Sequence, residues 1–193
     1  MSDLTKDDLR QQAKRHRGAL RPSLEDAEAA CDLFFEAVKP SSDHVVALYW
    51  PMNNEFSTQL ILERLMEEDI TCVLPVMQKD SERVLRFARW RIGDPMQEGA
   101  FKVHEPVVTD TTEWATPDII LVPLLAFDRR GHRLGYGSGY YDATLDSLRQ
   151  EHEVVSVGIA YDAQMVLFPL PADPHDQPLD LVITPQKVYR FEE

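Results

Sequence analysis

The chain has 193 residues, of which 44% are hydrophobic and 27% charged, and its formal net charge is −13. That length favours a single domain over 1–193, and the acidic balance argues against general nucleic-acid binding. No apolar run is long enough to predict a membrane span or a signal peptide. Cys31 and Cys72 lack CxxC spacing, so we expect no disulfide framework or zinc site, and a reducing cytoplasm as location.

Helical and strand patterns alternate along the chain. Thr5 with Asp8 resembles a capping box ahead of a first helix, and Pro22-Ser23 begins a second. Further helices are expected over 57–68 and 140–150, whereas 93–116 has weak periodicity and is predicted to be mostly loop. The predicted strands are 44–50, 70–76, 84–90, 118–123, 154–160, 179–184 and a short 187–191. This alternation predicts an α/β fold of three layers, Rossmann-like, with a mostly parallel or mixed open sheet and helices on both faces.

Polar loops follow several of these strands, at 51–55, at 127–139 and after Tyr161. Open α/β sheets bind ligands outside the carboxyl ends of their strands. We therefore expect these loops to converge on one side of the sheet.

Gly135, Gly137 and Gly139 stand at alternate positions just before a predicted helix. Glycine permits positive φ and leaves N–H groups uncovered, and a helix N-terminus favours an anion, so this loop is a candidate phosphate cradle. Turns also use glycine freely, so a plain turn is the alternative. The loop lacks the Gly-Lys-Ser/Thr of a Walker A motif, and it comes too long after its strand for a dinucleotide-binding fingerprint.

Basic residues gather near both candidate ligand segments. Arginines precede the glycine loop, and the first 21 residues are locally basic, with Lys6, Arg10, Lys14, Arg15, Arg17 and Arg21 against Asp3, Asp7 and Asp8. A basic end on an acidic protein suits a small anionic ligand better than a polymer. A solvated helix face is the alternative.

The longer string from Phe127-Asp128 through Arg133-Leu134-Gly135 to Tyr140-Tyr141-Asp142 closely resembles the signature of the 5-formyltetrahydrofolate cyclo-ligase family, also called 5,10-methenyltetrahydrofolate synthetases. Supporting segments occur in order along nearly the whole chain: Lys6-x-x-Leu9-Arg10, Met52-x-x-Glu55 and Pro174-His175-Asp176-x-x-x-Asp180. The resemblance implies a ligase that forms a carbon–nitrogen bond. It converts 5-formyltetrahydrofolate, with or without a polyglutamate tail, to 5,10-methenyltetrahydrofolate and releases ADP and phosphate from ATP.

The resemblance also implies the site residues. Asp142 and Asp176 match Mg²⁺ positions, and oxygen ligands suit that ion. Lys6, Arg10 and Arg133 would offset phosphate charge during catalysis. The ATP segments are Lys6, Asp7, Asp8, Leu9, Arg10 and Arg133, Leu134, Gly135, Tyr136, Gly137, Ser138, Gly139, Tyr140, Tyr141. The folate contacts are Trp50, Glu55, Tyr136, Gly137, Ser138, Gly139 and Tyr140.

Several of these residues have plainer interpretations. Asp142 could be a first-turn carboxylate favoured by the helix dipole, Asp176 a loop residue, Trp50 a core aromatic and Glu55 an acid at a helix start. Two positions depart from the family pattern, because Tyr136 and Ser138 stand where a basic or small residue is common. Without a cation at these positions, Arg133 would have to neutralise more of the phosphate charge. Phe101 and Glu105 are not assigned to the site, because the run before Glu105-Pro106 also departs.

Other functions remain as alternatives. A non-catalytic folate- or nucleotide-binding protein could keep the glycine loop without the metal aspartates, whose joint presence favours an enzyme. A Rossmann-type NAD-dependent oxidoreductase is disfavoured by the position of the loop, and a nucleotide-free sugar-phosphate isomerase would leave the aspartates unexplained. We expect a monomer with no nucleic-acid or membrane partner.

Overall fold

The computed structural model describes residues 5–21, 23–78 and 83–191. Within these residues seven strands form one sheet in the order β11-β10-β9-β6-β1-β2-β3. The central strands run parallel, and the edge strands β3 and β11 pair antiparallel with their neighbours. The strands are β1 Val45–Ala47, β2 Thr71–Val76, β3 Arg86–Arg89, β6 Ile119–Val122, β9 Val155–Ile159, β10 Leu181–Ile183 and β11 Val188–Arg190. The predicted mixed open sheet is confirmed.

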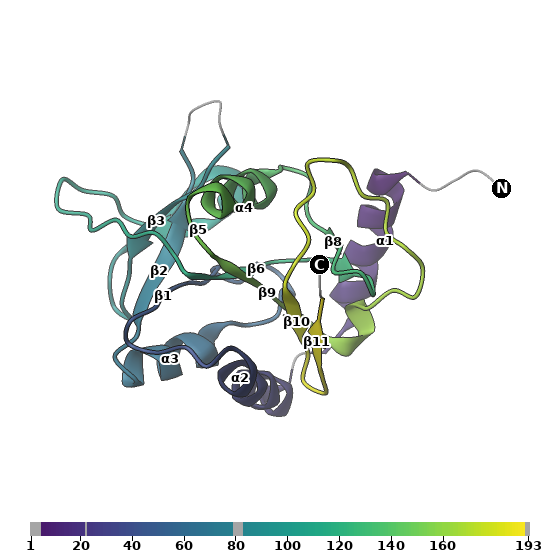
Figure 1. The fold of residues 1–193 in the computed structure, drawn as a ribbon, viewed down its shortest axis with the longest axis horizontal. Helices are drawn as coiled ribbons and strands as arrows, with labels where there is room; N and C mark the ends of the chain where they lie inside the picture. Colours follow the sequence, from purple (N-terminus) through teal and green to yellow (C-terminus); the bar gives the residue numbers. More distant parts are fainter. Residues whose placement is uncertain (1–4, 22, 79–82, 192–193) are drawn as a thin grey trace.

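Helices cover both faces of this sheet (Figure 1). Helices α2 (Leu24–Val38) and α3 (Gln59–Glu67) pack on one face, and α4 (Tyr140–Glu151) packs on the other. Successive residues of β6 point to opposite faces, so Ile119 joins the core under α2 and α3 while Ile120 joins the core under α4. Continuous apolar strands suit a sheet buried on both sides, and the three-layer prediction is confirmed.

The first helix, α1 (Lys6–Ala19), lies apart from the sheet. Its predicted capping box is present, because Thr5 accepts from the Asp8 backbone and Asp8 accepts from the Thr5 backbone. Its apolar face packs through Leu9 into a separate small core with Ala126, Leu134 and Leu170. This core belongs to the hairpin of β7 (Ala126–Phe127) and β8 (Arg133–Leu134), beside which α1 lies in Figure 1. The basic helix is therefore held against the glycine-rich loop.

Some predicted boundaries were wrong. Segment 93–116 contains a second hairpin, β4 (Met96–Glu98) with β5 (His104–Pro106), joined through a short 3-10 turn, η1 (Ala100–Lys102). Its strands are too short to show a period. The strand predicted over 44–50 is in the ladder only from Val45 to Ala47. The β7–β8 hairpin was not predicted. A second 3-10 turn, η2 (Asp162–Gln164), follows β9. Pro22, predicted at the start of the second helix, lies outside the described residues.

The order of the strands predicts where a ligand lies. The chain passes from β1 to β2 on one side and later places β6 on the other side of β1. Loops leaving β1 and β6 therefore diverge, and α/β sheets bind ligands at such a switch point. In the part of the chain that the structure describes, no helix has the length and apolar character needed to span a membrane.

Candidate active site

A cavity of about 1040 Å³ opens where β1 and β6 end. The loop after β1 contributes residues from Met52 to Glu55, and the segment after Tyr161 contributes Asp173 and Asp176. The glycine-rich loop and helix α1 form other parts of the lining. The predicted convergence of the three loops is confirmed, and the volume is at the upper end of ligand pockets, which reach ~1,000 Å³.

Most of the residues implied by the resemblance line this cavity: Lys6, Arg10, Trp50, Glu55, Arg133, Leu134, Gly135, Tyr136, Gly137, Ser138, Gly139, Tyr140, Tyr141, Asp142 and Asp176. Among the described residues, Asp7, Asp8 and Leu9 do not, and other contacts account for them. Asp7 pairs with Arg10, Asp8 caps the helix, and Leu9 is buried in the small core. Trp50 lines the cavity and also packs edge-on against Trp90 at 5.5 Å between ring centroids.

The glycine loop needs glycine at two points. Gly137 has φ of 95° and Gly139 has φ of 76°, a region that side chains disfavour. A Cβ on Gly137 would lie only 3.1 Å from Arg10 Cζ, because the Arg10 Nε donates to the Gly135 carbonyl at 3.2 Å. Gly139 is also the N-cap of α4, and it has no side chain to accept hydrogen bonds from the first N–H groups of that helix. Free amides, a helix dipole and Arg10 therefore face one space, as anion binding requires.

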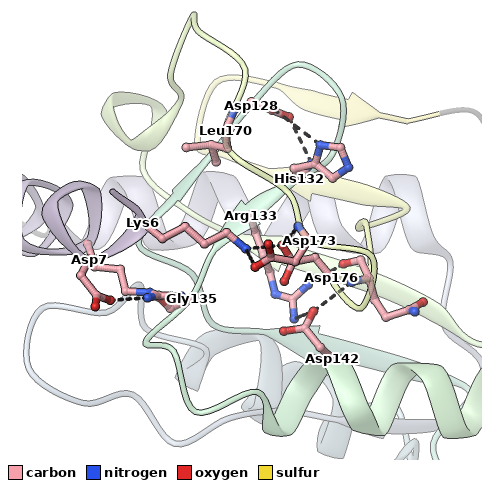
Figure 2. A network of polar contacts seen from close by, with 12 residues as sticks. Lys6, Asp7, Asp128, His132, Arg133, Gly135, Asp142, Leu170, Asp173 and Asp176 are labelled. Carbon is pink, nitrogen blue, oxygen red and sulfur yellow. Dashed lines mark hydrogen bonds and ion pairs between the residues drawn. The ribbon is translucent and has the colours of Figure 1, made fainter. Parts of the chain in front are cut away.

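Lysine and arginine in this space are paired with carboxylates (Figure 2). Arg133 Nη2 donates to Asp142 Oδ1 at 2.8 Å, and Lys6 Nζ donates to Asp176 Oδ2 at 2.6 Å and also to Asp173. Burial alone would lower the pKa of Lys6, but the hydrogen bonds to these two aspartates outweigh it and raise that pKa. Burial likewise opposes ionisation of Asp176, yet the bond from Lys6 holds its pKa below the usual value. Both partners are therefore charged.

The aspartates fit Mg²⁺ that arrives with phosphate. Asp142 and Asp176 share the lining of a smaller cavity of about 390 Å³ next to the start of α4. Within residues 5–21, 23–78 and 83–191, no group of three or more His, Cys, Asp or Glu side chains could cage a metal. Mg²⁺ is commonly held by one or two carboxylates together with substrate phosphates and waters. The donors present match that mode of binding.

Glu55 lies in the opposite part of the site and is buried, with 7% of its side chain exposed. It accepts from the Met52 backbone at 2.7 Å and from the Tyr136 hydroxyl at 2.6 Å, and Arg17 Nη1 lies 3.9 Å away. Burial raises the pKa of Glu55, and these neighbours offset the rise only in part. Burial and the nearby Glu55 also raise the pKa of Tyr136. The acid is thus held by neutral and cationic donors at the cavity wall.

Two residues of this wall were not assigned to the site from the sequence. Arg17 is 3% exposed, and Glu105 is 8% exposed and accepts from the Met77 backbone at 3.1 Å. Arg17 could have been found, because Lys6, Arg10, Lys14 and Arg17 follow the spacing of one helical face. Glu105 was left out of the site because the run before Glu105-Pro106 departs from the family pattern.

The fold and the site together define an α/β protein with a phosphate-type loop and a buried acid in one cavity. The chain belongs to the 5-formyltetrahydrofolate cyclo-ligase family, whose model matches residues 3–185. It is 35% identical over 150 residues to the 5-formyltetrahydrofolate cyclo-ligase of Escherichia coli strain K12, covering 77% of this chain and 81% of that protein. The Mycolicibacterium smegmatis enzyme of the same name is 30% identical over 194 residues, 97% of each chain.

A solved structure agrees with this assignment. The 5,10-methenyltetrahydrofolate synthetase of Aquifex aeolicus superposes with a TM-score of 0.75 at 29% identity, covering 98% of this chain and 94% of that one. The family predicted from the glycine-loop signature is confirmed, and with it the predicted fold class.

Proposed function

We propose that this chain converts 5-formyltetrahydrofolate to 5,10-methenyltetrahydrofolate in an ATP- and Mg²⁺-dependent reaction that releases ADP and phosphate. Membership of the cyclo-ligase family supports the overall reaction. The observation that carries the residue assignments is the joint lining of one cavity by the glycine loop, its cations and the buried Glu55. An NAD-dependent oxidoreductase is not favoured, because the glycine loop follows the β7–β8 hairpin rather than a strand of the main sheet.

The chemistry needs activation of a poor leaving group. Transfer of the γ-phosphoryl group breaks its bond to ADP and forms a bond to the formyl oxygen. The second folate nitrogen then bonds to the formyl carbon and loses its proton, and the carbon–oxygen bond to phosphate breaks. No protein nucleophile is needed, so the protein acts by positioning and by charge neutralisation.

The cations near the glycine loop suit the first step. Lys6, Arg10 and Arg133 can bind phosphate oxygens, while the N–H groups of the loop orient them. In the present structure Lys6 and Arg133 hold carboxylates instead. Phosphate would replace those carboxylates as their partner. Asp142 and Asp176 would then be free to hold Mg²⁺, which supplies further neutralisation of phosphate charge when bound.

Glu55 suits the folate. An ionised carboxylate accepts paired hydrogen bonds, and the pterin ring offers an amino and a ring N–H side by side. The Trp50 side chain lines the same cavity and offers an aromatic surface. We also propose action as a monomer in the cytoplasm on folate with or without a polyglutamate tail.

The proposal is tested by incubating the protein with Mg-ATP and 5-formyltetrahydrofolate. The near-ultraviolet absorbance of the methenyl product should rise together with ADP. Folded protein that yields neither would refute the proposal. ADP release that does not depend on folate would instead indicate a plain ATPase.

The metal assignment has its own test. Asp142→Asn and Asp176→Asn should each lower Mg-ATP-dependent turnover more than they weaken folate binding. Loss of a residue that only supports a metal ligand typically costs about 10- to 100-fold in activity, so loss of a ligand itself should cost at least as much. Asp110→Asn, an exposed aspartate outside the lining of the cavity, is the matched control. Unchanged turnover in either site variant removes that residue from the metal site.

A further inference from the structure

Arg17 has unused donor capacity next to Glu55. Its side chain is 4% exposed and lines the main cavity. Its Nη1 makes two long contacts, at 3.5 Å to the Leu124 carbonyl and at 3.9 Å to Glu55 Oε1, and its buried Nε has no hydrogen-bond partner among the described residues. Buried polar groups are normally paired, and a guanidinium offers five N–H donors in a planar fork. The arrangement therefore leaves room for an acceptor from a ligand.

Tyr136 covers this pair of side chains in the present structure. Its hydroxyl donates to Glu55 Oε1 at 2.6 Å, and its ring centroid lies 5.4 Å from Arg17 Cζ. Tyr136 belongs to the glycine loop and is 37% exposed, so the ring can leave without disrupting a core. A hydroxyl that donates to the carboxylate has the same role that a ligand N–H would have.

The pterin edge is chemically complementary to Glu55 and Arg17 together. That edge presents in order an amino N–H, a ring N–H and the oxygen at carbon 4, which are two donors followed by an acceptor. Glu55 supplies two acceptor oxygens, and the guanidinium within 3.9 Å of one of them supplies a donor. On the basis of the proposed function, we infer that Arg17 is a substrate-binding residue that donates to the 4-oxo group, and that the pterin edge displaces the Tyr136 hydroxyl.

The consequence is a specificity for the substituent at carbon 4. A 4-amino ring would present a donor to the donors of Arg17, so both groups would remain unpaired. The neutral 4-amino ring also lacks the ring N–H that would donate to Glu55. Sites that hydrogen-bond one polar group reject an analogue that lacks it, because their own buried groups are left unsatisfied. Arg17 thus adds to the selection of 4-oxo folates over 4-amino analogues that Glu55 also favours.

The test measures equilibrium binding, without ATP, of 5-formyltetrahydrofolate and of its 4-amino-4-deoxy counterpart. Mildly alkaline buffer keeps the diaminopteridine ring neutral. A hydrogen bond to a charged group predicts that Arg17 contributes about 10- to 100-fold to the preference of the wild-type protein for the 4-oxo ligand. Arg17→Met should lower the preference by that factor, by weakening the 4-oxo ligand alone, and the preference that remains comes from Glu55. Arg15→Gln, an exposed change on the same helix, should leave both affinities unchanged.

Two further variants keep the inference open to refutation if Arg17→Met does not fold. Arg17→Lys retains the charge but not the planar fork, so most of the contribution of Arg17 to the preference should disappear. Tyr136→Phe should bind 5-formyltetrahydrofolate about 2- to 10-fold more tightly, because no hydroxyl must leave the carboxylate. Equal loss of both ligands in Arg17→Met, full preference in Arg17→Lys, or unchanged or weaker binding in Tyr136→Phe would overturn the inference. Wild-type protein that binds neither ligand would instead refute the proposed function.

Discussion

Asp128 connects two loops of the site through hydrogen bonds to its carboxylate, so its replacement should lower the stability of the protein by a measurable amount. The carboxylate is buried, and three backbone N–H groups donate to it: those of Arg130 at 2.9 Å, His132 at 3.1 Å and Leu170 at 2.9 Å. The first two belong to the turn before the glycine loop, and Leu170 precedes the segment that carries Asp173 and Asp176 (Figure 2). Asp128→Asn keeps the shape of the side chain and changes one oxygen to an N–H donor.

The magnitude follows from the geometry. Asp128 Oδ1 accepts from Arg130 and His132, and Oδ2 accepts from Leu170, so either orientation of the amide places a donor against a backbone donor. A buried unpaired donor costs about 1–3 kcal/mol, and the remaining bonds lose the strength of a charged acceptor. The ion pair with the half-exposed Arg130 adds little. We expect a total loss of about 2–4 kcal/mol, or about 4–16 °C in Tm for a chain of this size.

Urea denaturation of Asp128→Asn, followed by circular dichroism, measures this loss, and the exposed Asp110→Asn serves as the control. Burial opposes ionisation of Asp128, but the backbone donors outweigh it and lower its pKa below the ordinary value of 3.8. The stabilisation is therefore fully present above that value and is lost as pH falls through the lowered folded pKa. A free energy of unfolding at neutral pH within about 0.5 kcal/mol of wild type would refute the reasoning.

Three further outcomes are expected. Gly137→Ala should raise the KM for ATP about 10-fold in steady-state kinetics, because φ of 95° and the nearby Arg10 both oppose a Cβ. An unchanged KM would show that the loop does not fit closely around ATP. The KM for folate should rise as pH falls through the pKa of Glu55, which burial raises above the ordinary 4.5. Glu55→Gln should lose that dependence, and a pH profile that keeps it would assign it to another group. Thr5→Ala should cost about 1 kcal/mol in urea denaturation through loss of the capping box, and no loss would mean that packing alone holds α1.

Local patterns in the chain were enough for much of the fold. The Thr5 capping box, the apolar runs of the buried strands and the glycines before α4 act over a few neighbouring residues, so their consequences can be read from sequence. Segment 93–116 shows the limit of such reasoning. Its hairpin is held partly by Glu105, whose carboxylate accepts from the backbone of Met77, directly after β2. No periodic pattern within the segment predicts a contact with a residue so far away in the chain.

The sequence by itself determined the alternation of elements, the phosphate-type loop and the family, because each depends on residue types at short spacing. Only the tertiary structure decided that α1 lies against the glycine loop instead of the sheet, since Leu9 joins the small core of the β7–β8 hairpin. The same packing carries Arg17 to the wall of the cavity. Glu55 and Tyr136 are 81 residues apart in the chain, yet they share one hydrogen bond. Such contacts depend on how the layers and loops meet in space, which residue spacing does not encode.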